Sequence, residues 1–244
     1  MVLAREVRVR ASAPFRPEDV LDRLRSANPR AMVFAFGIGD QCFLGATPEL
    51  LVRLSQRTVT AHCLAGSIAR GASEDEAAEL AQRLLASAKD RVEHEIVVQS
   101  TEAALRAVCD EVVRAPDAPY VVRSGSVQHL LTPVTGRVRN GKGLLELLDV
   151  LHPTPAVGGF PREVALAAIR EREGLDRGWY AGPVGWMDFA GDGMFAVAIR
   201  SALLTGAEAC LYAGCGIVAG SEPEAEYQET CLKLKPMLAA LNLQ

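Results

Sequence analysis

Apolar and polar residues alternate in short runs along much of the chain, which is the period-two pattern of half-buried β-strands. Glycine or proline follows most of these runs, as expected for strands joined by tight turns. The predicted strands are Met1–Arg10, Met32–Ile38, Cys42–Gly45, Leu50–Leu54, Thr58–Leu64, Val121–Leu131, Trp179–Val184, Met194–Leu204 and Ala209–Val218. The short connections predict antiparallel pairing, with a hairpin at Gly39-Asp40 and a meander over the last three strands.

Other stretches repeat apolar residues at helical spacing, and they alternate with the strands. The predicted helices are Arg16–Ala27, a long region from Ser73 towards Cys109, Gly143–Leu151, Arg162–Glu173 and the run that follows Ser221. Ser73 with Glu76 and Ser221 with Glu224 have the spacing of a capping box. His152–Pro161, rich in proline and glycine, is predicted to be a loop. No repeat or linker interrupts this order, which favours one α+β domain over residues 1–244.

Composition excludes several classes of protein. The 244 residues, 49% hydrophobic and 23% charged, are sufficient for a large core. A net charge of −4 gives no electrostatic basis for binding nucleic acid or an anionic membrane, and no apolar run is long enough to span a bilayer. The six cysteines lack CxxC spacing and the four histidines lack a zinc-like arrangement. We therefore expect a cytoplasmic monomer without a zinc site.

Two pairs of carboxylates stand three residues apart on predicted helices. Glu226 and Glu229 share a helix face with Lys233, and Asp90 and Glu93 repeat the acidic pattern on the earlier helix. One such face is typical of a solvated helix with an internal ion pair. Two acidic pairs on two helices, however, offer the oxygen ligands that Mg²⁺ prefers. The spacing therefore allows a magnesium site without requiring one.

Glu49 follows Thr47-Pro48 at a predicted kink between two strands. A carboxylate at a proline turn is usually solvated, but rigid placement among apolar residues would raise its pKa and suit a general acid. The small residues Ala65-Gly66-Ser67 would let backbone N–H groups approach a ligand anion, or would form an ordinary turn. Both alternatives stay open from the residues alone.

Eight segments, in order along the chain, resemble the chorismate-utilising enzymes, a family that includes isochorismate synthase, salicylate synthase, anthranilate synthase component I and aminodeoxychorismate synthase. The segments are FLGATPELLVR, LAGSIARG, SAKDRVEHEIVV, VQHLLTPVTG, LHPTPAVGGFPR, RGWYAGPVGW, FAVAIRSAL and YAGCGIVAGSEPEAEYQETCLKLKPML. They cover essentially the whole chain. The resemblance implies two large antiparallel sheets forming a sandwich-like core, helices outside, and a Mg²⁺-dependent chorismate site between the sheets.

The resemblance also implies which residues form this site. Glu93 and Glu229 would hold Mg²⁺, with Asp90 and Glu226 one helical turn away as indirect or water-mediated partners. The residues that would contact chorismate are Arg200, Lys233, Gly66 and Gly216 at its carboxylates, and Tyr180 and His129 at its ring. Glu49 would be the catalytic acid.

Ala156 stands where family members that eliminate pyruvate typically carry threonine, and this favours isochorismate synthase within the family. In that reaction water attacks C2 of chorismate and the C4 hydroxyl leaves, protonated by Glu49, for menaquinone or siderophore biosynthesis. A salicylate or anthranilate synthase is the alternative.

The chain departs from the family pattern at its beginning. A family lysine that activates water lies directly before the first strand, which here begins at Met1, so no residue maps onto it. We expect a catalytic domain incomplete at its N-terminus, either through a late start assignment or as a shortened, non-catalytic chorismate-binding fragment. Thr47 replaces a serine, and Met194 replaces a glutamate whose loss would remove a polar contact near the pocket.

Overall fold

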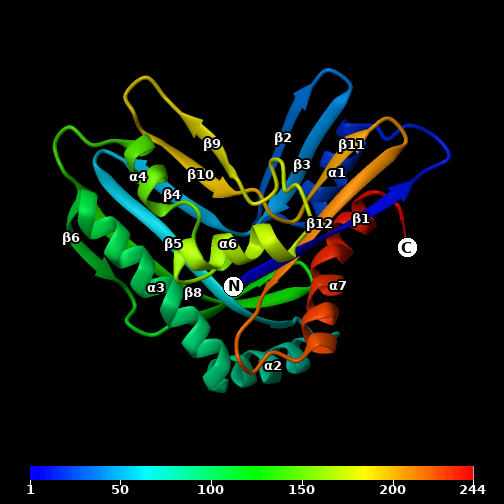
Figure 1. Cartoon of the computed structure of the whole chain (residues 1–244). Helices are drawn as coiled ribbons and strands as arrows, with labels where there is room; N and C mark the ends of the chain where they lie inside the picture. The colour runs from blue at the N-terminus through cyan, green and yellow to red at the C-terminus, as the bar shows by residue number, and fades with distance from the viewer. Residues whose placement is uncertain (244) are drawn as a thin grey trace.

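Across residues 1–243, which the computed structural model describes, the chain forms the predicted α+β fold with two antiparallel sheets. A five-stranded sheet has the order β1-β12-β11-β3-β2, and a seven-stranded sheet has the order β6-β8-β5-β4-β10-β9, with β7 paired to β8. The sheets meet in the middle of the molecule and diverge as the two arms of a V (Figure 1). Helices lie outside them, as the sequence predicts.

The elements follow one another in the order of their numbers within each class. The strands are β1 (Val2–Arg10), β2 (Met32–Ile38), β3 (Gln41–Thr47), β4 (Leu50–Ser55), β5 (Thr58–Ala69), β6 (Cys109–Arg114), β7 (Tyr120–Ser124), β8 (Val127–Val138), β9 (Pro183–Met187), β10 (Gly193–Val197), β11 (Ser201–Thr205) and β12 (Glu208–Gly216). The helices are α1 (Pro17–Ala27), α2 (Glu74–Ala86), α3 (Ala88–Val108), α4 (Leu144–Leu151), α5 (Pro155–Gly158), α6 (Arg162–Arg172) and α7 (Pro223–Ala240).

Two predicted strands are each divided in the structure. The run Met194–Leu204 forms β10 in one sheet and β11 in the other, because Arg200 adopts a left-handed conformation with φ of 54°. The predicted meander of the last three strands is therefore wrong. The run Val121–Leu131 likewise turns at Gly125, with φ of 56°, into the hairpin of β7 and β8. In the first run apolar residues flank the break closely and conceal it. The second run has the polar turn sequence Arg123-Ser124-Gly125-Ser126 at its break, which the strand prediction overlooked.

The predicted long helix after Ser73 is two helices, α2 and α3, separated at Ser87. Ser73 caps α2 as predicted, because its Oγ accepts a hydrogen bond from the N–H of Glu76 at 3.1 Å. The Glu76 carboxylate accepts from the N–H of Ala72 instead of completing the box with Ser73. The break at Ser87 matters for the site because α3 begins directly after it.

The second predicted capping box is wrong. Helix α7 begins at Pro223, and the Oγ of Ser221 accepts a hydrogen bond from the N–H of Val218 at 3.1 Å. Proline at the first helical position suits its fixed φ and its missing N–H group. The predicted loop His152–Pro161 contains one helical turn, α5.

Two neighbouring chain segments cross from one sheet to the other where the sheets meet. Strand β3 continues through Pro48 into β4 of the other sheet, and β10 returns through Ala198–Arg200 to β11. The crossings are hydrogen-bonded, from the N–H of Ala46 to the Arg200 carbonyl at 3.2 Å and from the N–H of Val197 to the Glu49 carbonyl at 3.0 Å. Glu49 and Arg200 are therefore held on adjacent backbone segments.

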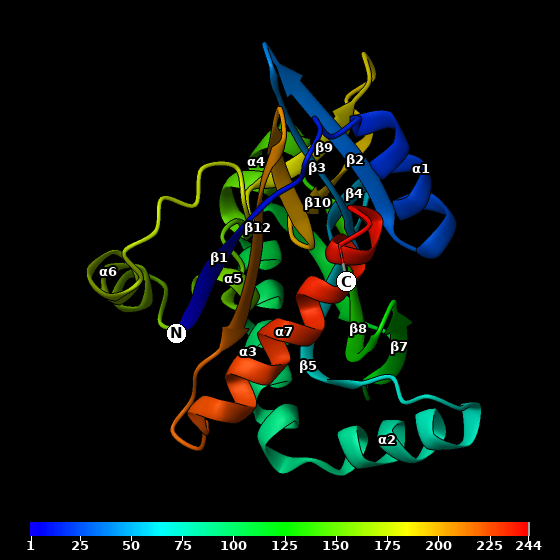
Figure 2. The ribbon, with the colours of Figure 1, turned by 90° about the vertical axis from the view of Figure 1, so that its right-hand side faces the viewer.

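Two apolar clusters hold the helices against the sheets. One joins α3 and α4 to the seven-stranded sheet and includes Val52, Leu105 and Leu147. The other joins α1 and α7 to the outer face of the five-stranded sheet and includes Leu24 and Leu211 (Figure 2). Burial of each such side chain contributes about 1.5–3 kcal/mol. These clusters fix α3 and α7 on opposite sides of the space where the sheets meet.

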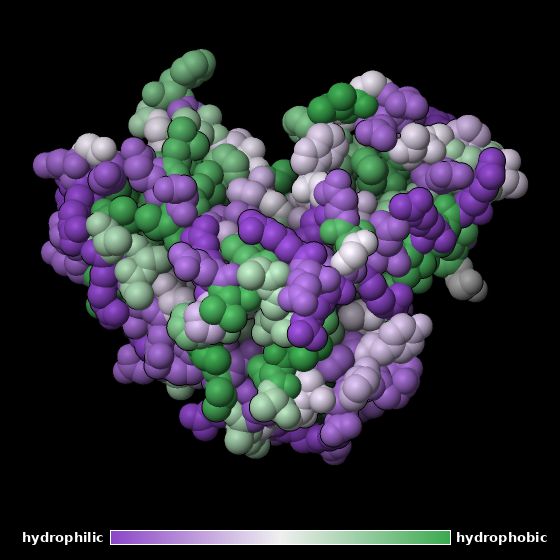
Figure 3. Space-filling model, in the orientation of Figure 1, coloured by the Kyte–Doolittle hydropathy of each residue, from purple (hydrophilic) through white to green (hydrophobic). Residues whose placement is uncertain are grey.

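The upper ends of both arms expose large apolar side chains. Phe36 and Ile38 lie on β2, and Trp186 and Met187 lie on β9, each more than two-fifths exposed. The space-filling view shows apolar residues on both sides of the notch between the arms (Figure 3). In the described part of the chain, no helix combines the length and apolarity needed to span a membrane.

Candidate active site

A cavity lies where the two sheets meet, bordered by α3 and α7. Every residue predicted to catalyse or to contact substrate lines it, namely Glu49, Gly66, His129, Ala156, Tyr180, Arg200, Gly216 and Lys233. Of the predicted metal ligands, Glu93 and Glu229 line it as well. Residues from nine separate segments of the chain therefore converge on one cavity, and their individual roles stay predictions.

Glu49 is buried at the crossing between β3 and β4, with 4% of its surface exposed. Its N–H donates to the Oγ1 of Thr47 at 3.2 Å, so threonine supplies the hydroxyl that serine has in the family pattern. Burial raises the pKa of Glu49 from 4.5 to about 7, although Lys233 and Arg200 lower it in part. A large share of this carboxyl is therefore protonated near neutral pH, as a general acid requires.

Arg200 is a buried cation that has no carboxylate partner in the described part of the chain. Only 7% of it is exposed, and no carboxylate of residues 1–243 lies within ion-pair distance of its guanidinium. Burial lowers its pKa to about 10, so it remains charged at neutral pH. Burying an unpaired charge is costly, and a carboxylate ligand would satisfy it with strong, charge-assisted hydrogen bonds.

His129 orients this guanidinium. Nη2 of Arg200 donates to Nε2 of His129 at 3.1 Å, so the ring proton must be on Nδ1, which donates to Oγ of Ser67 at 2.9 Å. Burial, together with Arg200 and Lys233, lowers the pKa of His129 well below its usual value. The ring is therefore neutral and acts as an acceptor for Arg200. Sequence analysis identified Ser67 only as a small residue and missed this contact.

Two carboxylates face the cavity from different helices, Glu93 from α3 and Glu229 from α7. Burial raises the pKa of Glu93, and the neighbouring Glu229 raises it further. The ammonium of Lys233 binds Oε1 of Glu229 at 2.5 Å and donates to the Gly214 carbonyl at 2.9 Å. A Cβ atom on Gly216 would lie 2.5 Å from Oε1 of Glu93, so a larger residue there would displace that carboxylate from its observed position.

Asp90 and Glu226 do not line the cavity. The Asp90 carboxylate accepts a hydrogen bond from Ser87, and Glu226 forms an ion pair with Lys89 at 2.9 Å. Within residues 1–243, no group of three or more His, Cys, Asp or Glu side chains is arranged to hold a metal ion. Of the four carboxylates only Glu93 and Glu229 therefore face the cavity, and the charges of Lys233 and Lys89 partly offset the effect of Glu229 and Asp90 on the pKa of Glu93.

Glu93 and Glu229 nevertheless fit a magnesium ion by the chemistry of their donors. Magnesium in proteins is commonly bound by one or two carboxylates together with water and substrate oxygens, and these two carboxylates face one cavity. Burial raises the pKa of Glu93 most and Glu229 raises it further, and a bound cation would relieve the part due to Glu229. Asp90 and Glu226 would act at most indirectly.

Two further cavity residues were missed by sequence analysis. Tyr212 stacks on Tyr180 with ring centroids 5.2 Å apart, and it lies four residues before Gly216 on the same face of β12. Arg177 lies with its guanidinium 6.0 Å from the centre of the Tyr180 ring and is held by two hydrogen bonds to Glu173. The alternation of side chains along a strand places Tyr212 on the same face as Gly216, so this signal could have identified Tyr212. The position of Arg177 depends on the tertiary fold.

The chain matches the family model described as "Chorismate binding enzyme" over residues 1–242. It belongs to this family.

Three members of the family show how far the similarity extends. The salicylate biosynthesis isochorismate synthase of Pseudomonas aeruginosa is 51% identical over 99% of this chain and 50% of its own. The isochorismate synthase MenF of Bacillus subtilis is 46% identical over 99% of this chain and 51% of its own. A crystal structure of the putative 2,3-dihydroxybenzoate-specific isochorismate synthase DhbC from Bacillus anthracis covers 100% of this chain and 67% of that one, with 39% identity and a TM-score of 0.97. The chain thus spans about half the length of the curated relatives that it matches.

Ala156 and Met194, two positions that bear on the comparison of this chain with the family pattern, lie in different surroundings. Ala156, in α5, lines the cavity. Met194 lies on β10 in register with Arg53 and Trp186 and does not line it. The expected loss of a polar contact near the pocket therefore does not apply to Met194.

Proposed function

We propose that this chorismate binding enzyme is an isochorismate synthase, which converts chorismate into isochorismate for menaquinone or siderophore biosynthesis. The observation that carries the proposal is a buried acid with a pKa of about 7, Glu49, beside the buried guanidinium of Arg200, which has no counter-ion among residues 1–243. Such a pair suits an anionic substrate that must be protonated as it reacts. The names of the relatives support the same reaction.

Chorismate carries two carboxylates, and the cavity offers two places for them. Arg200 and Lys233, with backbone N–H groups near Gly66 and Gly216, would bind one carboxylate. Glu93 and Glu229 would hold Mg²⁺, which when bound supplies positive charge for a second carboxylate and neutralises the two glutamates. The stacked pair of Tyr180 and Tyr212 would border the ring.

In the reaction, Glu49 would donate its proton to the C4 hydroxyl, which leaves as water. A second water molecule adds its oxygen to C2 and loses a proton, while the double bonds of the ring shift between these carbons. The product has the composition of the substrate, so the reaction is an isomerisation. The family pattern assigns activation of the attacking water to a lysine directly before the position of Met1, and Val2, the residue after Met1, lines the cavity.

A second candidate function is binding of chorismate without turnover. It is favoured by one observation: within residues 1–243 the only lysine lining the cavity is Lys233, and Glu229 and the Gly214 carbonyl already engage its ammonium. A lysine in that state is a poor base.

Incubation with chorismate and Mg²⁺, followed by chromatography of the products, tests both candidates. We expect isochorismate as the product. Formation of salicylate with pyruvate, or of anthranilate when ammonia is supplied, would refute the proposed reaction. Calorimetric binding of chorismate without any product would favour the second candidate. Glu49→Gln should bind chorismate without converting it, whereas Glu171→Gln, at an exposed position on α6, should behave like the unaltered chain.

A further inference from the structure

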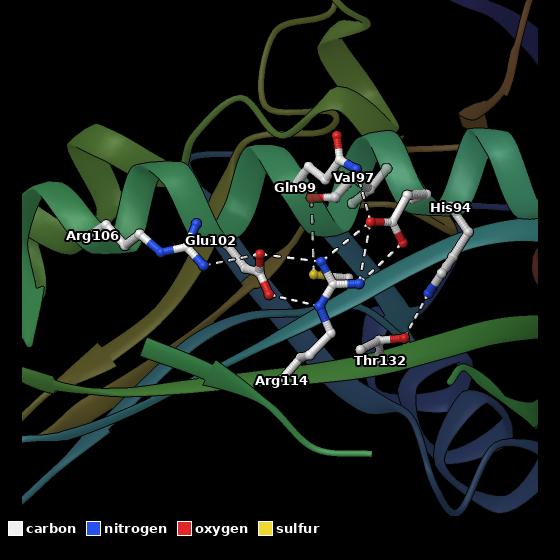
Figure 4. Close-up of polar contacts among 9 residues, drawn as sticks. His94, Val97, Gln99, Glu102, Arg106, Arg114 and Thr132 are labelled. Atoms are coloured by element: carbon white, nitrogen blue, oxygen red, sulfur yellow. Dashed lines mark hydrogen bonds and ion pairs between the residues drawn. The ribbon is translucent and has the colours of Figure 1, made fainter. Parts of the chain in front are cut away.

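The two residues that directly follow Glu93 attach helix α3 to the seven-stranded sheet; His94 is labelled in Figure 4, and the other is Glu95. Nε2 of His94 and Oγ1 of Thr132 on β8 share a hydrogen bond of 2.8 Å, and both residues are almost completely buried. The carboxylate of Glu95 accepts hydrogen bonds of 3.1–3.2 Å from the guanidinium of Arg114 on β6. Neither contact touches the cavity.

Arg114 also binds Glu102, with hydrogen bonds of 2.7 and 3.1 Å. Glu95 and Glu102 are seven residues apart, which places them on one face of α3 two turns from each other. The planar fork of a guanidinium fixes the direction of both carboxylates. Arg106 contacts only Glu102, at 3.2 Å, and its side chain is 59% exposed, so it adds little to this attachment.

The rotation of α3 about its own axis decides where the Glu93 carboxylate lies. A carboxylate lies about 6 Å from its helix axis, so a helix rotation of about 10° displaces it by about 1 Å. Metal and substrate sites tolerate displacements of only about 0.5 Å. The space at Glu93 is also narrow, because Gly216 approaches its carboxylate and Gly66 packs against Asp90 one turn earlier.

We propose that Thr132 and Arg114 are positioning residues that set the rotation of α3 and thereby aim the Glu93 carboxylate into the cavity for a divalent cation. The inference rests on the proposed role of Glu93 in holding Mg²⁺. Thr132 acts through His94, and Arg114 acts through Glu95 and Glu102. Loss of a residue that orients a metal ligand typically weakens metal binding by about 10- to 100-fold.

Calorimetric titration with Mg²⁺ alone, without chorismate, measures this effect independently of activity. Thr132→Val keeps the shape of the side chain but removes the hydroxyl, and we expect it to weaken Mg²⁺ binding about tenfold or more. Thr132→Ser keeps the hydroxyl and should restore binding. Arg114→Lys keeps the charge without the fork and should also weaken it. Arg106→Lys is the matched control and should bind Mg²⁺ like the unaltered chain.

All titrations are made at a temperature at which circular dichroism shows every variant to be folded. If Glu93→Gln leaves Mg²⁺ binding unchanged, the proposed metal site is wrong, and the inference fails with it. If Glu93→Gln abolishes binding while Thr132→Val and Arg114→Lys match the unaltered chain, the positioning inference alone is overturned. Equal weakening in Arg106→Lys would attribute the effect to general destabilisation and would also overturn it.

Discussion

Replacing Glu49 with glutamine should stabilise the protein at alkaline pH, although it removes the proposed proton donor. Glu49 is buried, and burial raises the pKa of its carboxyl group from 4.5 to about 7 against the opposing effect of Lys233 and Arg200. The folded protein therefore resists ionisation of this group, whereas the unfolded chain does not. Glutamine has a similar shape and carries no charge at any pH.

The sign and size of the effect follow from the two pKa values. Below a pH of about 4.5 the carboxyl group is protonated in both states, so its ionisation costs no stability. As the pH rises towards about 7, only the unfolded state loses the proton, and the free energy of unfolding falls by up to about 3.4 kcal/mol. Between about pH 5 and about pH 8, the unaltered chain should lose about 2.5 kcal/mol relative to Glu49→Gln.

Urea unfolding followed by circular dichroism at these two pH values measures the difference. Glu171→Gln, an exposed substitution of the same kind, corrects for general effects of removing a carboxylate. A stability gap of the same size at both pH values would refute the conclusion that Glu49 is forced towards its neutral form. So would a Glu49→Gln variant that is less stable than the unaltered chain at about pH 8.

Three further predictions concern ligand binding. Arg200→Gln should weaken chorismate binding by about 10- to 100-fold in calorimetry, because a charge-assisted hydrogen bond is lost, and unchanged affinity would exclude Arg200 as the carboxylate anchor. Gly216→Ala should fold normally but weaken Mg²⁺ binding, because its Cβ would lie 2.5 Å from Oε1 of Glu93; equal Mg²⁺ affinity would place the ion elsewhere. Mg²⁺ and chorismate should each tighten binding of the other by the same factor, and chorismate titrations that agree with and without Mg²⁺ would contradict this linkage.

Sequence analysis predicted most of the architecture because local patterns encode it. The alternation in β1 and β12 and the helical spacing in α1 and α6 depend on neighbouring residues only. At the proline turn the residues alone left open whether Glu49 is solvated or held rigidly among apolar residues, and the structure buries it. The single domain, the monomer and the cytoplasmic location stay predictions.

Features that depend on distant residues were not predicted. The left-handed conformation of Arg200 divides the run Met194–Leu204 between two sheets. Apolar residues stand on both sides of Arg200, and no glycine or proline in VAIRS marks the division. Lys89 binds Glu226, which lies 137 positions later in the sequence. The spacing of the acidic pairs therefore could not show that Glu226 is held by Lys89 and Asp90 by Ser87. The resemblance to the family identified the cavity residues, whereas the hydrogen bonds among them required the fold.

The paired crossings at Glu49 and Arg200 have a mechanical consequence. Both residues lie where the chain passes between the sheets, and backbone hydrogen bonds join the two passages. If the angle between the arms changes, displacement grows with distance from this pivot, so the hairpin ends travel furthest and Glu49 and Arg200 travel least. The proposed proton donor and the proposed anchor for the substrate carboxylate would keep their spacing while the walls of the cavity open and close around them.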